Sequence, residues 1–269
     1  MKKRIICLLL TVAVAFSALL IWTIIDNKTL RLHEITVHDS DLPDSFDGFC
    51  IAHISDLHSA QIGQGNEKLL QLLRDAKPDI IAITGDLIDC RDADPTIAIN
   101  LCRDAAKIAP VYFITGNHEA RLSEDLYNRL LDELQSAGVV LLLDQEQIIA
   151  QDDASISIVG HRWGETDNLA ALSDFDGFTI LLSHQPEDIS NYAAADFDLV
   201  LSGHAHGGQF RLPFVGGLFA PGQGIFPEYD AGLYLVDETQ MVVSRGIGNS
   251  SFPLRFNNSP EIILIRLES

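Results

Sequence analysis

The sequence predicts an α/β domain that is carried on one N-terminal membrane helix. As far as Ala137, short apolar runs alternate with amphipathic helical patterns, which is typical of a parallel sheet with right-handed crossovers. Beyond Ala137, short strands follow one another with few helices between them, as a second, mixed sheet requires. Ahead of both lies an apolar stretch of 21 residues without a charge, from Ile5 to Ile25.

The stretch from Ile5 to Ile25 is long enough to span a membrane, since a helix needs about 20 apolar residues to do so. Three basic residues before it favour a cytoplasmic amino terminus, with the rest of the chain outside. Ala13-Val14-Ala15 has the spacing of a signal-peptide cleavage site, which is the alternative, but the apolar run continues for ten more residues and favours an uncleaved anchor. We expect the anchor at residues 1–26 and one domain at residues 27–269.

The charge of the chain is strongly acidic. The formal net charge is −20, and residues 27–269 alone hold 15 basic and 37 acidic residues, a net charge of −22. Such a surface disfavours nucleic acid as a primary partner, because nonspecific binding depends on Lys and Arg that neutralise phosphates. An anionic substrate would be attracted by something else, such as bound metal ions.

The cysteines do not form a recognisable framework. Cys7 lies in the apolar stretch, which leaves three others without CxxC spacing, so we expect neither a zinc cluster nor a disulfide scaffold. Buried free thiols at Cys50 and Cys102 are favoured. A bridge between Cys90 and Cys102 is the alternative.

The elements of the first half follow from periodicity and capping signals. Pro95 stands at a permitted early helix position, and Ser123 precedes two acids as an N-terminal helix signal. We expect strands at 30–37, 51–55, 79–84 and 111–116 and helices at 66–76, 94–108 and 123–137. In the second half we expect strands of a second, mixed sheet at 139–143, 156–159, 178–182, 199–202, 232–236, 241–244 and 262–265.

Several of these strands end in residues that bind metals. The run that ends at Asp86 is the clearest, because Gly85 permits a tight turn and the carboxylate can bridge two cations, one on each oxygen. Asp56, whose motif also contains His58, lies 30 residues earlier and Asn117 lies 31 residues later, spacings that match βα units of roughly 30 residues. Open α/β sheets bind ligands at the carboxyl ends of their strands.

Two later motifs add imidazoles at strand ends. His184 follows one apolar run, and His204-Ala205-His206 follows the next, flanked by three glycines that leave both rings uncrowded. Three other histidines, at 33, 38 and 53, share no such position and are expected to be structural.

The motifs SDLH, GDL, GNHE, SHQP and GHAHGGQ, in this order, resemble those of the calcineurin-like metallophosphoesterase superfamily. The N-terminal apolar segment and the tail motifs around Tyr234, Arg245 and Arg255 are similar to those of the membrane-associated YkuE/YaeI-type phosphodiesterases. The segment Gly160-His161-Arg162-Trp163 departs from that pattern, which has an acidic residue soon after the glycine. The resemblance implies a four-layer α/β/β/α sandwich of two mixed sheets.

The resemblance also implies a site with two divalent metal ions, Mn, Fe or Zn. One ion would take Asp56, His58, Asp86 and His206, and the second would take Asp86, Asn117, His184 and His204. His118 would be the catalytic histidine. By this implication a hydroxide that bridges the ions attacks phosphorus, and His118 either stabilises developing charge or protonates the leaving oxygen.

We therefore expect a phosphohydrolase that acts on diesters or monoesters of a small-molecule or lipid-linked substrate, outside the membrane. Arg211, Arg245 and Arg255 are weak candidates for phosphate contacts, because guanidinium matches phosphate geometry. One alternative is a pyrophosphatase that acts on a nucleotide-linked lipid such as UDP-2,3-diacylglucosamine. Another is a scaffold without activity, which the complete set of ligand residues disfavours.

Overall fold

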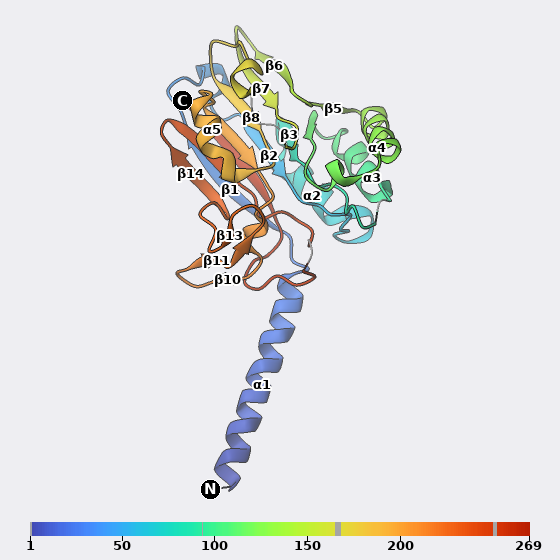
Figure 1. Ribbon diagram of the computed structural model, residues 1–269, viewed down its shortest axis with the longest axis vertical. Helices are drawn as coiled ribbons and strands as arrows, with labels where there is room; N and C mark the ends of the chain where they lie inside the picture. Colours follow the sequence, from blue (N-terminus) through green and yellow to red (C-terminus); the bar gives the residue numbers. More distant parts are fainter. Residues whose placement is uncertain (1, 93, 165–167, 250–251) are drawn as a thin grey trace.

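The apolar runs of the sequence form two six-stranded sheets that pack face to face. We describe the protein from a computed structural model, which covers residues 2–92, 94–164, 168–249 and 252–269. Helices cover the outer face of each sheet, so the domain is the expected four-layer α/β/β/α sandwich (Figure 1).

The first sheet is built from the N-terminal half and the last strand. Its parallel strands β2 to β5 follow the βαβ pattern, and the C-terminal strand β16 runs antiparallel to β2 and parallel to β1. In spatial order the strands are β1 (Arg31–His38), β16 (Glu261–Glu268), β2 (Cys50–Ile54), β3 (Ile80–Thr84), β4 (Val111–Ile114) and β5 (Val139–Leu141).

The second sheet contains four parallel strands with one antiparallel strand at each edge. In spatial order these are β14 (Gly232–Val236), β15 (Thr239–Val243), β9 (Leu199–Ser202), β8 (Thr179–Leu182), β7 (Ala154–Gly160) and β6 (Gln145–Gln151). Two small hairpins follow β9, formed by β10 (Arg211–Leu212) with β11 (Gly216–Gly217) and by β12 (Phe219–Ala220) with β13 (Gly224–Ile225).

Three hydrophobic layers hold the sandwich together. Helices α2 (Glu67–Ala76), α3 (Thr96–Ala105) and α4 (Glu124–Ser136) pack on the outer face of the first sheet. The middle layer lies between the sheets, where Ile51 and Ile114 meet residues such as Ile180. Helix α5 (Ile189–Ala194) packs on the outer face of the second sheet through Tyr192.

The assignment of two strands to the second sheet was wrong. The predicted strands at 139–143 and 262–265 belong to the first sheet, as β5 and β16. Strand β5 follows α4 and continues the parallel series beside β4, and β16 inserts between β1 and β2. Strand β6 was missed, because its sequence QEQIIAQ is mostly polar and its side chains are mostly exposed.

The cysteines carry free thiols. Cys50 and Cys102 are buried, as expected, and Cys90 and Cys102 are not bonded to each other. Burial raises the pKa of the Cys102 thiol to about 12, which makes it a poor nucleophile.

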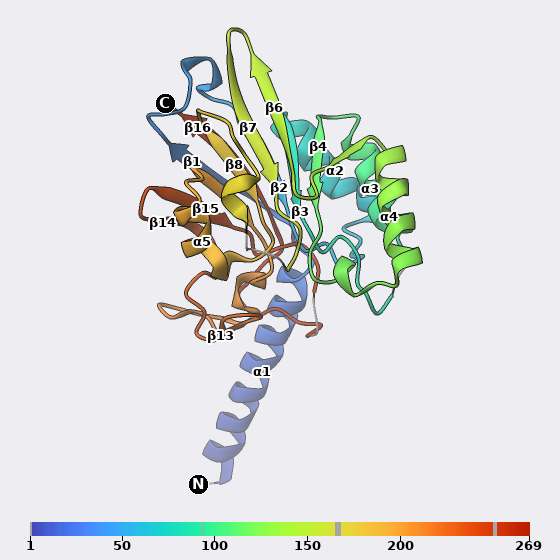
Figure 2. The same ribbon diagram turned by 45° about the horizontal axis from the view of Figure 1, so that its top comes forward.

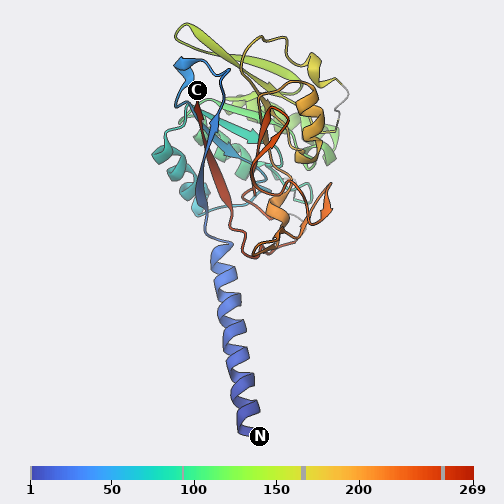
Figure 3. The same cartoon turned by 90° about the vertical axis from the view of Figure 1, so that its left-hand side faces the viewer.

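Helix α1 (Lys2–Asp26) projects from one end of the domain (Figure 3). Its residues Lys3–Asp26 contain an 18-residue window with a mean hydropathy of 2.7, and this helix is long and apolar enough to cross a membrane. The end of α1 is fixed to the domain, because the side chain of Asn27 exchanges two hydrogen bonds of 2.7 Å with the backbone of Arg255. The hydroxyl of Ser259 donates to Asp26 at 2.6 Å.

Candidate metal centre

Five loops meet where strands of the two sheets end. The loops follow the carboxyl ends of β2, β3 and β4 in the first sheet and of β8 and β9 in the second, and β3 contacts β8 across the sandwich. They carry all of the predicted site side chains, which are buried: Asp56, His58, Asp86, Asn117, His118, His184, His204 and His206.

The backbone of these loops is strained in a consistent way. Five of the seven predicted ligands have a positive φ, between +46° and +65°, namely Asp56, His58, Asp86, His204 and His206. Such a conformation is uncommon outside glycine and costs of order 1–3 kcal/mol, and it is concentrated at functional sites. This backbone conformation points the five side chains into the site.

Glycines at two strand ends make room for the carboxylates. A Cβ at Gly116 would lie 2.3 Å from Asp86 Oδ1, and a Cβ at Gly203 would lie 2.5 Å from Asp56 Oδ2. Any side chain at either position would therefore displace a carboxylate of the site.

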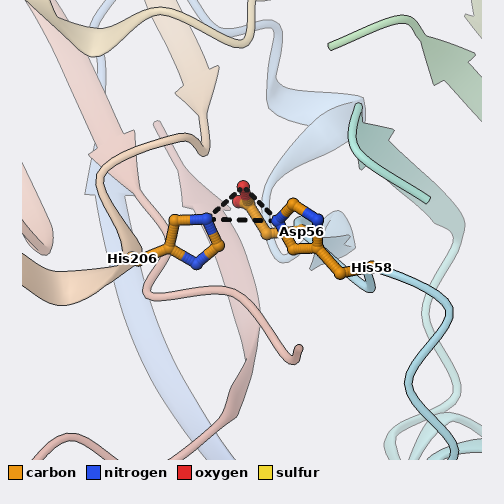
Figure 4. Close-up of side chains that lie close together, drawn as sticks. All are labelled: Asp56, His58 and His206. Atoms are coloured by element: carbon orange, nitrogen blue, oxygen red, sulfur yellow. Dashed lines mark hydrogen bonds and ion pairs between the residues drawn. The ribbon is translucent and has the colours of Figure 1, made fainter. Parts of the chain in front are cut away.

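Asp56, His58 and His206 form the first cluster (Figure 4). Asp56 Oδ1 lies 3.7 Å from His58 Nε2 and 3.4 Å from His206 Nε2, and the two ring nitrogens are 3.2 Å apart. The other oxygen, Oδ2, is held by the Ser55 hydroxyl at 2.6 Å and the His204 amide at 3.1 Å. One carboxylate oxygen and two imidazole nitrogens thus converge on one point.

Asp86, His184 and His204 form the second cluster, whose ligand atoms lie within 4.8 Å of one another. Asp86 Oδ2 lies 3.3 Å from His184 Nε2 and 3.6 Å from His58 Nε2, so it faces both clusters. Its other oxygen accepts the backbone N–H of His118 at 2.8 Å. The geometry differs from the expected bridge through both oxygens, because Oδ2 alone faces the two groups of histidines.

The buried polar atoms of the site fit a pair of cations. His184 Nδ1 lies 2.6 Å from the carbonyl of Thr84 and must donate there, so Nε2 of the neutral ring carries a lone pair that points at Asp86 Oδ2. Two acceptors that face each other need a positive charge between them. Asp56 Oδ1, Asn117 Oδ1 and His184 Nε2 are buried and have no hydrogen-bond partner among the described residues.

The pKa of His184 also reflects the negative charge of the buried carboxylates. Burial alone would lower the pKa of His184, but the carboxylate of Asp86 outweighs it and raises the pKa to about 10. Burial dominates at His204, whose pKa falls to about 3. The difference arises because His184 Nε2 is in direct contact with a carboxylate, and a cation would satisfy that carboxylate in place of the proton.

His118 is oriented by the loop after β3. Its Nδ1 accepts the backbone N–H of Cys90 at 3.1 Å, so the proton of the neutral ring sits on Nε2. That nitrogen lies 4.0 Å from Asp86 Oδ2. Its ring is 4.4 Å from that of His58, centre to centre. His118 therefore presents an N–H at the edge of the clusters, which suits a hydrogen-bond donor to a developing charge.

Glu119 is a site residue to which sequence reasoning assigned no role. Its carboxylate accepts the backbone N–H groups of Asp86 at 2.9 Å, Gly116 at 2.8 Å and Ile88 at 3.2 Å. Burial raises its pKa to about 7, together with the carboxylate of Asp86 and against the three N–H donors. Glu119 thus fixes the two loops that present Asp86 and His118.

We expect Glu119→Ala to lower the free energy of unfolding by about 3 kcal/mol, because it leaves three buried N–H groups without an acceptor. Urea denaturation measures this loss. Glu119→Gln keeps the shape and one acceptor oxygen and should lose less. Equal stability of Glu119→Ala and the parent protein would show that the loops hold themselves.

The three candidate arginines make intramolecular contacts. Arg211 pairs with Asp230 at 3.0 Å, and Arg245 lies 3.5 Å from Glu261. Arg255 is fully buried, donates to the carbonyl of Arg245 at 2.6 Å and lies 3.4 Å from His206 Nδ1. These contacts favour structural roles, with Arg255 supporting the loop of His206.

Trp163 is another site residue that sequence reasoning missed. Its ring centre lies 4.9 Å from that of His204 and 5.4 Å from that of His184. The indole therefore covers one side of the second cluster. Trp163 reaches this position because the loop after β7 meets the loops after β8 and β9. The sequence alone does not reveal that contact.

The two-sheet sandwich with two His/Asp clusters at its strand ends defines a metal-dependent phosphohydrolase. Residues 50–208 match the calcineurin-like phosphoesterase family, to which this chain belongs. The family uses a dinuclear metal centre, and the two clusters correspond to it.

Individual relatives agree with this assignment. The chain is 32% identical over 247 residues to the metallophosphoesterase YkuE of Bacillus subtilis (88% of this chain, 85% of the relative). It is 30% identical over 232 residues to the phosphodiesterase YaeI of Escherichia coli (81% and 82%). The structure of TT1561 from Thermus thermophilus shares the fold, with a TM-score of 0.50 at 14% identity (74% and 90%).

Proposed function

We propose that this chain hydrolyses phosphate diesters or monoesters at a centre of two divalent metal ions. The observation that carries the proposal is the position of Asp86 Oδ2, which faces His58 of one cluster and His184 of the other. The first ion would be held by Asp56, His58, Asp86 and His206. The second would be held by Asp86, Asn117, His184 and His204.

The donor set suits borderline cations. Carboxylate and amide oxygens combined with imidazole nitrogens match Mn, Fe or Zn. When bound, such a pair supplies Lewis acidity, which activates water and neutralises the phosphoryl oxygens. The completeness of the buried donor set argues against a scaffold without activity.

The residues of the chain complete the reaction. Hydrolysis forms a bond from the water oxygen to phosphorus and breaks the bond to the leaving oxygen, which must gain a proton. His118 Nε2 carries a proton and faces the clusters, so we assign it a hydrogen bond to the leaving oxygen, which takes its proton from the attacking water. Trp163 beside His204 narrows the approach from its side.

An assay with bis(p-nitrophenyl) phosphate and p-nitrophenyl phosphate tests the proposal. We expect hydrolysis of at least one of them, loss of activity after chelation and its return with Mn, Fe or Zn. Activity that persists in a chain freed of metal would contradict the proposal.

We also propose that α1 is an uncleaved anchor and that residues 27–269 lie outside the membrane. Three basic residues precede the span, whereas Lys28 and Arg31 are the only ones close after it, and this bias supports a cytoplasmic amino terminus. The acidic domain also has no electrostatic attraction to an anionic leaflet.

An impermeant thiol reagent tests this orientation. Asp153→Cys places a thiol on the exposed β6–β7 turn, in a Cys90→Ser background where Cys50 and Cys102 are buried. We expect labelling in intact cells, on a band that retains α1. Labelling only after lysis would mean that the domain is cytoplasmic.

A further inference from the structure

The end of the domain from which α1 emerges is unusually apolar. Outside α1, twelve large apolar side chains are exposed in the described part of the chain, and seven of them belong to residues 212–226 or to Phe252. They are Leu212, Phe214, Val215, Phe219, Ile225, Phe226 and Phe252, which we call the apolar rim. The rim includes every exposed phenylalanine described outside α1.

The rim lies beside the point where α1 joins the domain. The hairpins β10–β11 and β12–β13 stand at the α1 end of the domain in two different views (Figures 1 and 2). The junction is rigid through Asn27, and the ring of Trp22 lies 6.0 Å from that of Phe256. The orientation of the rim relative to α1 is therefore fixed.

The length of α1 brings the membrane up to this rim. Its 25 residues span about 37 Å, more than the roughly 30 Å of a hydrocarbon core. Ile24 and Ile25 are exposed one turn or less from its end, and Trp22 is of the type that sits at membrane interfaces. If α1 spans the bilayer, the rim lies at its surface.

The rim carries little charge, which is compatible with contact to a membrane surface. Residues 210–226 contain one basic and no acidic residue, whereas residues 27–269 carry a net charge of −22. Phe214 is fully exposed at the turn of β10–β11, and its φ is +67°. A bulky apolar residue is strained at such a φ. Its side chain also stays in contact with water unless another surface covers it.

An apolar cavity is lined both by residues of the rim and by one predicted metal ligand. It has a volume of about 360 Å³, and its walls include His206 and the apolar residues Phe210, Leu218, Phe219, Pro221 and Phe252. Gln209 also lines the cavity. Its side-chain N–H groups donate to the carbonyls of Phe252 and Leu254, at 3.0 and 2.9 Å. Phe219 and Phe252 belong to the rim as well, so the cavity has walls from the rim and from a predicted metal ligand.

We propose that the apolar rim docks into the lipid surface and that the cavity beside His206 takes an acyl chain of a lipid phosphoester, which is the substrate. An acyl chain in the cavity would place the phosphate of the same molecule at the two clusters. This inference rests on the proposed phosphoesterase activity and adds the source and class of the substrate.

The test compares two substrates with one leaving group, using the full chain in phosphatidylcholine nanodiscs. One is soluble bis(p-nitrophenyl) phosphate, and the other is phosphatidyl-p-nitrophenol in the nanodisc. The readout is the ratio of the lipid rate to the soluble rate for Phe219→Asp, Phe252→Asp and the control Leu235→Ser. Leu235 is an exposed apolar residue on β14, in a hollow beside His38, at the far end of β1 from α1.

We expect the ratio to fall at least about tenfold in the two cavity variants, which corresponds to the burial of two methylene groups. It should stay within about twofold in the control. Equal ratios in all variants would overturn the lipid inference alone. If the parent protein hydrolysed neither of these diesters nor p-nitrophenyl phosphate, the proposed function itself would be overturned.

Docking of the rim has its own readout, which does not depend on activity. In a Trp22→Phe background, Phe214→Trp should gain fluorescence that brominated lipids quench, and the control Leu235→Trp should not. Equal quenching of the two variants would overturn the docking.

Discussion

Asp86→Asn is expected to abolish hydrolysis and to lower the bound metal to about one ion per chain or none. The reason is that Asp86 Oδ2 faces both His58 and His184, at 3.6 and 3.3 Å, so both ions would lose their shared anion. The substitution keeps the shape of the side chain, and the amide oxygen can still accept the His118 N–H. Metal analysis and the diester assay on the same preparation measure the two effects.

Asp79→Asn is the matched control for Asp86→Asn. Asp79 directly precedes the same strand, β3, and its carboxylate accepts the Cys50 N–H at 2.8 Å, at the end opposite the site. It should keep two ions and full turnover. An Asp86→Asn protein that also kept both would disprove the bridging role.

His118→Ala is expected to reduce kcat by about 10²–10³-fold, the usual effect of removing a hydrogen-bond donor to charge that develops in the transition state, while both metals stay bound. His118 Nε2 is 4.0 Å from the nearer oxygen of Asp86, farther than the nitrogens of His58 and His184. Its Nδ1 is engaged by the Cys90 N–H, which fixes the ring without any metal. Steady-state kinetics and metal content separate the two roles.

His38→Ala serves as the control, because His38 is exposed at the end of β1 and should change neither quantity. Loss of a metal in His118→Ala would make His118 a ligand. The structure gives that outcome a basis, because a ring nitrogen of His118 lies within 4.8 Å of ligand atoms of His58 and Asp86.

The sequence was sufficient to predict which side chains meet. Each motif follows an apolar strand, and parallel strands deliver their carboxyl ends to one edge, so strand and motif together imply proximity. The pairing of strands was harder. The apolar pattern of 262–265 identifies a buried strand but contains nothing about its neighbours, and only the fold inserts β16 between β1 and β2.

The support of the site was beyond the reach of sequence patterns. Glu119 accepts hydrogen bonds from the backbone N–H groups of Asp86 and Ile88, 33 and 31 residues earlier in the chain. Every residue type except proline has such a donor, so a sequence pattern does not identify these bonds. Arg255 could be read as a surface cation, yet it is fully buried behind His206. In both cases the function of the residue depends on contacts between distant segments.

The most direct test of the two-metal centre is an anomalous difference map from crystals loaded with Mn. We expect two peaks about 3.5–4 Å apart. One should lie among Asp56, His58 and His206, the other among Asn117, His184 and His204, with Asp86 Oδ2 between them. A single peak, or a pair that does not share Asp86, would contradict it.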